Sequence, residues 1–288
     1  MKNFDYIKPS NVADAVSALK EHENTFLFAG GTDLLAGMKS NILKPQYIID
    51  LKGIPSINSF EYKDGWNFGA LTTVRDIEIS ENLQKNIPFL CQAASCLGSI
   101  QIRNRATLGG NLCNASPAAD MSTIFLAMDS KIKIITVDNE RVVELDNFFT
   151  GPNSTTLNRG EMLTEIIVSK DIERFKGIYI KFGPRKAMDI GIVNIAVLLD
   201  ADFKNGSCNE IRIALGAVAP TVIRARRTED LLNGNLLSPD LIAMAAEMAS
   251  SESDPISDFR ASADYRKELV KTLVARGIDT ILAANRTN

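Results

Sequence analysis

Two glycine pairs, far apart in the chain, stand in segments that could bind a negatively charged group. The first segment spans residues 29–33 (AGGTD), and the second spans residues 107–111 (TLGGN). Paired glycines let the backbone adopt left-handed conformations and approach a ligand closely, because no Cβ stands in the way. Backbone N–H groups in such turns form an anion-binding concavity, to which a following helix adds its positive N-terminal dipole. Both segments are therefore predicted to grip one diphosphate from two sides, and an ordinary tight turn is the alternative at each.

Polar side chains beside the glycines supply further groups of the kind that a nucleotide needs. Thr32, Thr107, Asn111 and Asn114 offer neutral donors, and Asp120 is placed to accept a hydrogen bond from a ribose hydroxyl. The chain contains neither the GxGxxG fingerprint of a Rossmann fold nor the GxxxxGK(S/T) sequence of a P-loop. A dinucleotide bound here is therefore expected to be held in a different way, without a lysine on its diphosphate.

Side chains for catalysis or metal binding are scarce. The only histidine, His22, lies in a polar segment and is predicted to be a solvated surface residue, with a lone base as the alternative. The four cysteines, at positions 91, 96, 113 and 208, show no CxxC spacing and are predicted to be free buried thiols of a reducing compartment. A Ser-His-Asp triad or a multi-histidine metal site is hard to build from this set. We therefore predict no catalytic side chain, no metal site, and a bound organic cofactor that supplies the chemistry.

The composition is that of a globular protein without the electrostatic signature of a nucleic-acid binder. The 288 residues include 35 acidic and 32 basic side chains, for a formal net charge of −3, and 45% of them are apolar. This length is sufficient for two domain-sized cores. No stretch of about 20 predominantly apolar residues is present, and no apolar run follows the N-terminal lysine. We therefore expect no nucleic-acid partner, no membrane insertion, no signal peptide and a cytoplasmic location.

Two α/β lobes are expected to carry the two glycine turns. In residues 1–55, Ser10 is a candidate N-cap for a helix, and the order strand, glycine turn, helix and strand is typical of a β-α-β unit. In residues 56–171, strand and helix patterns surround the second turn. The sequence therefore predicts one domain of two lobes over residues 1–171.

The pattern changes after residue 171. Three long strand candidates at 177–182, 190–200 and 210–219 precede helical patterns at 225–233, 238–250 and 262–284. Strands followed by helices indicate an α+β arrangement. Residues 172–288 are therefore predicted to form a C-terminal domain of three-stranded antiparallel sheet plus helices, which makes the whole chain α+β.

Several segments resemble the FAD-binding (medium) subunit of the molybdenum hydroxylases, a family that includes xanthine dehydrogenase, CO dehydrogenase and nicotinate dehydrogenase. The segments are residues 28–35 (FAGGTDLL), 101–120 (QIRNRATLGGNLCNASPAAD), 181–190 (KFGPRKAMDI), 216–221 (GAVAPT) and 259–266 (FRASADYR). The likeness covers nearly the whole chain, and the second segment is the most specific. It implies a two-lobed FAD-binding domain of the vanillyl-alcohol-oxidase (PCMH) type, followed by a C-terminal domain like that of CO dehydrogenase flavoproteins.

The resemblance also implies where FAD binds, extended in the cleft between the lobes with its diphosphate on the two glycine turns. The residues at the matching positions are Leu27, Phe28, Ala29, Gly30, Gly31, Thr32, Asp33, Leu34, Thr107, Gly110, Asn111, Asn114, Asp120, Leu163 and Lys181. Asp120 should hold the adenosine ribose, Leu163 should form an aliphatic wall near the adenine, and Lys181 should reach the edge of the flavin ring. A solvent-facing strand lysine is the alternative for Lys181.

Three further residues lie in the matching segments without a settled role. Ile190 is expected either beside the flavin ring or in the core. Arg103 and Arg105 are expected to brace the second turn, and contact with phosphate is the alternative.

In this family the flavin subunit does not transform the organic substrate. The resemblance implies that a molybdopterin-binding large subunit hydroxylates the substrate, and that electrons pass through 2Fe–2S clusters of a small subunit. FAD then hands them to NAD⁺ or another acceptor. We therefore expect an FAD-binding electron-transfer subunit of a heterotrimeric, xanthine dehydrogenase-like oxidoreductase. The alternatives are a stand-alone flavin oxidoreductase of the same fold and an interaction subunit that has lost FAD.

Overall fold

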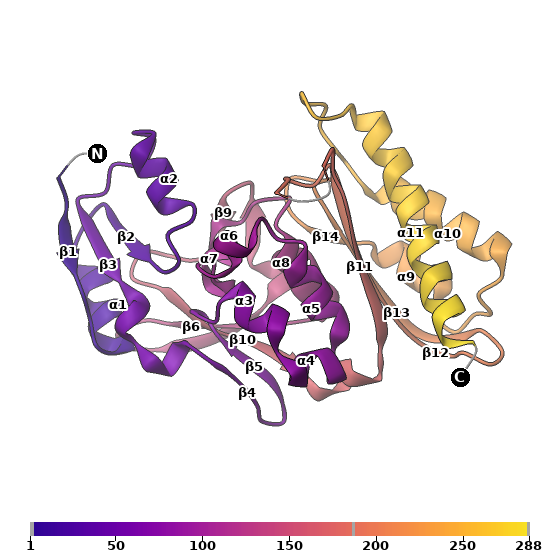
Figure 1. Cartoon of the computed structure of the whole chain (residues 1–288), viewed down its shortest axis with the longest axis horizontal. Coiled ribbons are helices and arrows are strands. Elements are labelled where there is room, and N and C mark those ends of the chain that lie inside the picture. The colour runs from indigo at the N-terminus through magenta and orange to yellow at the C-terminus, as the bar shows by residue number, and fades with distance from the viewer. Residues whose placement is uncertain (1–2, 186–187, 287–288) are drawn as a thin grey trace.

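Three sheet-based units lie side by side along the molecule in the computed structural model, which describes residues 3–185 and 188–286. The first lobe lies at one end, the second lobe in the middle, and the C-terminal unit at the other end (Figure 1). Lys186 and Ala187, which belong to one of the family-like segments, lie outside the described residues. Among the residues that are described, no helix combines the length and apolar character that a bilayer crossing requires.

The first lobe is a three-stranded parallel sheet with two helices. Its elements are β1 (Asp5–Ile7), α1 (Val12–Glu21), β2 (Thr25–Phe28), α2 (Leu34–Lys39) and β3 (Tyr47–Asp50), with the strand order β1-β3-β2. The expected β-α-β unit is therefore β2, the first glycine turn, α2 and β3. The N-cap of α1 is Asn11 rather than Ser10, because the Asn11 side chain accepts the N–H of Asp14 at 2.9 Å.

The second lobe is a five-stranded antiparallel sheet packed against helices. The strand order is β4-β5-β10-β6-β7, and all of its pairings are antiparallel. Its strands are β4 (Phe60–Tyr62), β5 (Gly65–Gly69), β6 (Lys131–Ile135), β7 (Glu140–Glu144) and β10 (Met162–Ser169). Its helices are α3 (Val74–Ile79), α4 (Glu81–Asn86), α5 (Pro88–Ser95), α6 (Ile100–Arg103), α7 (Leu108–Asn114) and α8 (Asp120–Ala127). The rings of Phe68 in β5 and Phe125 in α8 pack edge-to-face with their centroids 5.5 Å apart, so the core lies between the sheet and α8.

Short elements connect these units. They are the 3₁₀ turns η1 (Leu51–Gly53), η2 (Pro55–Ile57), η3 (Leu145–Asn147) and η4 (Lys170–Arg174), and the small hairpin of β8 (Phe149–Gly151) and β9 (Ser154–Thr155). The turn η4 joins the second lobe to the C-terminal unit, and the domain boundary predicted at residue 171 falls within it.

The C-terminal unit contains the expected antiparallel sheet with three helices. Its elements are β11 (Lys176–Phe182), β12 (Val193–Asp202), β13 (Ser207–Gly216), β14 (Ile223–Arg224), α9 (Arg226–Leu232), α10 (Pro239–Glu252) and α11 (Ala263–Asn285). The strand order is β11-β12-β13-β14, so the structure adds one two-residue edge strand to the three long strands that the sequence predicts.

Both faces of this C-terminal sheet are buried. Ala196 and Leu198 of β12 pack into the core of the second lobe, whereas Ile195, Val197 and Leu199 pack into a core formed with the C-terminal helices. A strand buried on both faces reads as a continuous apolar run rather than an alternating one, as β12 does. The sheet therefore sits between the second lobe and the C-terminal helices.

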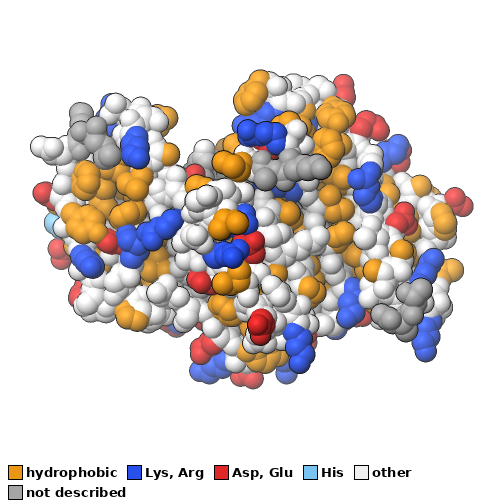
Figure 2. All heavy atoms as spheres, viewed as in Figure 1, with side chains coloured by type: hydrophobic (Ala, Val, Ile, Leu, Met, Phe, Trp, Pro, Cys, Tyr) orange, Lys and Arg blue, Asp and Glu red, His pale blue; other side chains and the backbone are white. Residues whose placement is uncertain are grey.

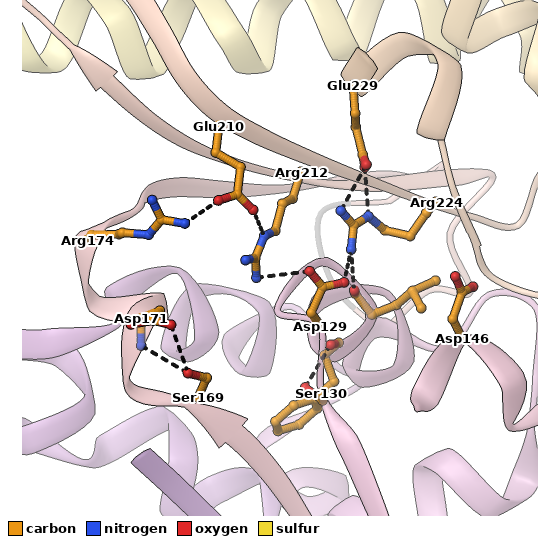
Figure 3. A network of polar contacts seen from close by, with 12 residues as sticks. Asp129, Ser130, Asp146, Ser169, Asp171, Arg174, Glu210, Arg212, Arg224 and Glu229 are labelled. Carbon is orange, nitrogen blue, oxygen red and sulfur yellow. Dashed lines mark hydrogen bonds and ion pairs between the residues drawn. The ribbon is translucent and has the colours of Figure 1, made fainter. Parts of the chain in front are cut away.

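A network of charged residues fastens the C-terminal unit to the second lobe (Figure 3). The guanidinium of Arg224 in β14 bonds Glu229 of α9 through Nε at 2.7 Å and also bonds Asp129, which follows α8. Arg212 of β13 reaches the same Asp129 carboxylate at 3.2 Å. The side chains of Arg224 and Glu229 are only 3% and 5% exposed, so this pair is buried, whereas the Asp129 side chain is 40% exposed. These contacts tie β13 and β14 to the residue that follows the C-terminal end of α8, the helix that begins at the candidate site residue Asp120.

Candidate functional site

The first glycine turn lies against the segment that leads directly into the second, as the diphosphate hypothesis requires. A Cβ built on Gly30 would stand 1.8 Å from the backbone carbonyl oxygen of Arg105, so the first turn is pressed against the chain that leads into the second. A cavity of about 190 Å³ opens at this junction. Its lining includes Gly30 and Lys52 of the first lobe and Arg105 and Thr107 of the second.

The first turn presents free backbone donors. Among the described residues, the N–H groups of positions 30–34 have no hydrogen-bond acceptor. Gly31 has a φ of +78°, a left-handed conformation that favours glycine, and α2 begins at Leu34 without a side-chain cap on its N-terminus. Adjacent unpaired N–H groups at the start of a helix are the donors that an anion requires.

The second turn differs, because its backbone donors are already used. The N–H groups of Leu108 and Gly109 bond backbone carbonyls of the segment 70–72, at 3.0 and 2.8 Å. The N–H of Gly110 bonds the Thr107 hydroxyl oxygen at 3.1 Å, in an N-terminal cap of α7. The expectation that both turns offer backbone N–H groups is therefore wrong for the second turn. The end of β5 runs alongside it and satisfies these donors.

Space and an unpaired acceptor remain at the second turn. A Cβ on Gly109 would collide with Ala70 at 2.8 Å, whereas a Cβ on Gly110 would meet only the movable Thr107 hydroxyl, which at 2.9 Å must shift to admit it. Gly109 therefore serves packing, and Gly110 leaves room for a ligand. The side-chain carbonyl oxygen of Asn111 is buried and has no hydrogen-bond partner among the described residues. An open glycine and an orphaned acceptor fit a polar ligand such as a dinucleotide.

Asp120 and Lys181 form a buried ion pair. Lys181 Nζ lies 2.9 Å from Asp120 Oδ2, and their side chains are only 10% and 8% exposed. The Tyr179 hydroxyl donates to Asp120 Oδ1 at 2.7 Å, and Lys181 also donates to the Cys96 carbonyl at 3.1 Å. Burial raises the pKa of Asp120, and the charge of Lys181 opposes that rise. The solvent-facing alternative for Lys181 is therefore wrong.

Tyr179 was not among the residues that the sequence singled out. It lies two positions before Lys181 on β11, so both side chains point to the same face of the strand. The alternation of residues along a strand was the signal that could have found it. Its partner Asp120 begins α8, in the other domain, and no local pattern links the two.

Other candidate residues lie apart from the turns or serve other contacts. Leu163 is 3% exposed, in the core of the second lobe. Asn114 ends α7 and is followed by Ala115 in the left-handed region, with a φ of +48°. Arg103 bonds Glu78 of α3 at 2.6 Å and so braces α6, as expected. Ile190 is 57% exposed, which makes the core alternative wrong for this residue.

The scarce reactive side chains have ordinary surroundings. His22 is half-buried rather than fully solvated, because its ring stacks on Tyr47 at 4.2 Å. All four cysteines are free; two are buried and two partly buried, so the expectation of full burial fails for half of them. Burial raises the pKa of Cys91 to about 11 and that of Cys208 to about 12, so both are protonated thiols.

Comparisons with known proteins agree with this geometry. Residues 2–170 match the model of the FAD binding domain in molybdopterin dehydrogenase, and residues 178–281 match that of the CO dehydrogenase flavoprotein C-terminal domain. The fold and the site thus define an FAD-binding flavoprotein of two domains.

Relatives that are similar over nearly their whole length identify the family within this class of flavoproteins. The glyceraldehyde dehydrogenase medium chain of Sulfolobus acidocaldarius is 31% identical over 279 residues, covering 96% of this chain and 98% of the relative. The xanthine dehydrogenase FAD-binding subunit of Escherichia coli O157:H7 is 31% identical over 282 residues, covering 97% and 96%. A chain of CO dehydrogenase from Oligotropha carboxidovorans superposes with a TM-score of 0.93 at 27% identity, covering 98% of both chains. The protein belongs to the family of FAD-binding medium subunits of the molybdenum hydroxylases. It is a subunit of an oxidoreductase, and in this family the molybdopterin and iron–sulfur centres belong to partner chains.

Proposed function

We propose that this chain is the electron-transfer subunit of a heterotrimer with a molybdopterin-binding large subunit and a small subunit that carries 2Fe–2S clusters. FAD, when bound, supplies redox chemistry that links one-electron donors to a two-electron acceptor such as NAD⁺. The observation that carries the proposal is the junction of the first glycine turn, whose N–H groups at residues 30–34 are free, with the segment that leads into the second turn, where Gly30 and Thr107 line one cavity. A cytoplasmic location belongs to the proposal, because the four cysteines are free thiols.

Within this proposal, the residues of the two turns divide the work of holding FAD. The N–H groups of residues 30–34 in the first turn donate to the diphosphate, and the segment from Leu27 to Leu34 wraps it and part of the flavin. The second turn contributes side chains, because its N–H groups are engaged: Thr107, Asn111 and Asn114 provide polar groups, and Gly110 leaves the approach open.

Residues farther from the turns bind the two ends of the cofactor in this proposal. Leu163 forms an aliphatic wall for the adenine. A carboxylate oxygen accepts more than one hydrogen bond, so Asp120 retains capacity for a ribose hydroxyl beside its bonds to Tyr179 and Lys181. The Lys181 ammonium, whose charge the Asp120 carboxylate neutralises, lies at the edge of the flavin. The local field there is therefore that of an ion pair rather than of a free cation, which weakens any preference for an anionic flavin.

Purification of the native chain tests this proposal. We expect it to show oxidised-flavin absorbance, to release free FAD on denaturation, and to co-purify with a molybdopterin subunit and an iron–sulfur subunit. A colourless chain with no affinity for FAD would contradict cofactor binding. A chain that is isolated alone and turns over an organic substrate would instead support the stand-alone flavin oxidoreductase.

For the substrate of the complex we propose a purine, in preference to carbon monoxide, an aldehyde or another N-heterocycle, because segment 259–266 resembles xanthine dehydrogenases. The named relatives act on glyceraldehyde, xanthine and carbon monoxide. Assays of the purified complex with xanthine, glyceraldehyde and carbon monoxide as separate substrates distinguish these possibilities, with NAD⁺ and an artificial dye compared as acceptors. Turnover of glyceraldehyde or carbon monoxide without xanthine turnover would contradict a purine substrate.

A further inference from the structure

Lys52 is a positively charged residue at the junction of the lobes that the sequence did not single out. It lies in η1, two residues after β3, and lines the same cavity as Gly30 and Thr107. Its side chain is 33% exposed, so the ammonium is held between the protein and the cavity. The space-filling view shows a notch between the first lobe and the rest of this face, with Lys and Arg side chains on both sides (Figure 2).

The position of the Lys52 ammonium is fixed by a buried carboxylate. Lys52 Nζ lies 2.5 Å from Asp50 Oδ1, and the Tyr6 hydroxyl bonds the other oxygen of the same carboxylate. The side chain of Asp50 is 5% exposed. Burial raises the pKa of Asp50, but the hydrogen bonds from Lys52 and Tyr6 outweigh it, so the net shift is downward and Asp50 stays ionised.

The same ammonium is connected to the first glycine turn. Lys52 Nζ stands 3.3 Å from the centroid of the Phe28 ring, in a cation–π contact. The edge of that ring lies 2.3 Å from the point where a Cβ on Gly31 would be. Asp50, Lys52 and Phe28 therefore form a stack beneath the turn that has the free N–H groups. Two of the three ammonium donors face the carboxylate and the ring, which leaves one for a ligand.

A second cation faces the cavity from the opposite lobe. Arg105 lines it, and among the described residues its guanidinium has no hydrogen-bond or ion-pair partner. Lys52 and Arg105 carry two positive charges, and Asp50 carries one negative charge. The lining, to which only Lys52 and Arg105 contribute charge, is positive even after the charge of Asp50 behind Lys52 is subtracted, which is the sign that attracts a diphosphate.

We propose that Lys52 is a binding residue for the diphosphate of FAD, held in place by Asp50 and Phe28 so that its remaining donor reaches the ligand beside the N–H groups of the first turn. This inference rests on the proposed function, because it assumes that the two turns bind a diphosphate. It replaces the expectation that the diphosphate is held without a lysine. In this proposal Lys52 contacts the cofactor directly and takes no part in the redox chemistry.

The test is the affinity of the flavin-stripped full-length chain for FAD, followed by quenching of flavin fluorescence. We expect Lys52→Met to raise the Kd about 10- to 100-fold, which is the range for losing one hydrogen bond between charged groups. Lys85→Met is the matched control, because it makes the same substitution at an exposed residue of α4 and should leave the Kd unchanged. An unchanged Kd in Lys52→Met would overturn the inference.

A second variant separates ligand binding from support of the fold. Lys52→Met leaves Asp50 buried without its cation, which could itself distort the first turn. The double variant Asp50→Asn with Lys52→Met removes both charges. If Lys52 contacts the diphosphate, the double variant still binds FAD weakly; recovery of wild-type affinity would show that Lys52 only neutralises Asp50 and would overturn the inference. Failure of the wild-type chain to bind FAD would instead contradict the proposed function.

Discussion

Removal of the Lys181 charge should destabilise the chain severely, because it leaves a buried carboxylate without its cation. In Lys181→Met the side chain of Asp120, 8% exposed, keeps only the hydrogen bond from Tyr179. Breaking a buried ion pair by removing one partner typically costs about 3–5 kcal/mol. A Coulomb estimate at an effective dielectric constant near 20 gives an attraction of about 6 kcal/mol at the 2.9 Å separation of this pair, and the desolvation of the two charges offsets part of it. We therefore expect the free energy of unfolding of the FAD-free chain to fall by about 3–5 kcal/mol.

The pH dependence of this loss has a definite sign. Burial already raises the pKa of Asp120 in the folded state, and without Lys181 it rises further. A carboxyl whose folded-state pKa exceeds its unfolded-state pKa binds more protons when folded, so stability falls as the pH rises through the interval between the two values. The destabilisation of Lys181→Met should therefore be large at neutral pH and shrink on acidification, as Asp120 becomes protonated.

Urea unfolding at several pH values measures both effects. Lys176→Met is the matched control, because Lys176 is exposed at the start of the same strand, and it should change stability by less than about 1 kcal/mol. The double variant Asp120→Asn with Lys181→Met removes both charges and should recover most of the loss. A destabilisation that is small, or that is equal at acidic and neutral pH, would refute the account of a buried pair with an ionised Asp120.

Three further substitutions test the junction and the domain interface. Gly30→Ala places a methyl group 1.8 Å from the Arg105 carbonyl oxygen, so it should lower the free energy of unfolding by about 3 kcal/mol and abolish FAD binding. An unchanged melting temperature would contradict the contact between the first turn and the segment that leads into the second. The methyl group of Gly110→Ala meets only the Thr107 hydroxyl, so this variant should change the free energy of unfolding by less than about 1 kcal/mol. It should nevertheless weaken FAD binding in a fluorescence titration. Wild-type affinity of Gly110→Ala for FAD would show that Gly110 is not part of the binding site. Arg224→Met removes the close partner of the buried Glu229, which keeps only Arg226 at 3.8 Å, and should cost about 3–5 kcal/mol in urea. Arg226→Met, at an exposed position, should cost less than about 1 kcal/mol. Equal losses in the two arginine variants would argue against a buried interface network.

Features that depend on local pattern were predicted well. The β-α-β order of the first lobe, the three long strands and the three C-terminal helices follow from periodicity and turn residues, and the structure contains all of them. Local preference was insufficient at the start of α1, where Ser10 and Asn11 are both good caps and only the backbone path selects Asn11. The two-residue strand β14 is too short to leave a pattern, and it exists because β13 pairs with it.

The sequence by itself determined the family, the two glycine turns and the scarcity of histidine and cysteine, because residue types and their spacing encode backbone conformation and available chemistry. Only the tertiary structure decided how the site is divided. It left the N–H groups of residues 30–34 free, satisfied those of the second turn from segment 70–72, paired Asp120 with Lys181, and brought Lys52 to the cavity. The physical reason is that hydrogen bonds and ion pairs are satisfied by whichever distant segments the fold brings together, and no local pattern records those partners.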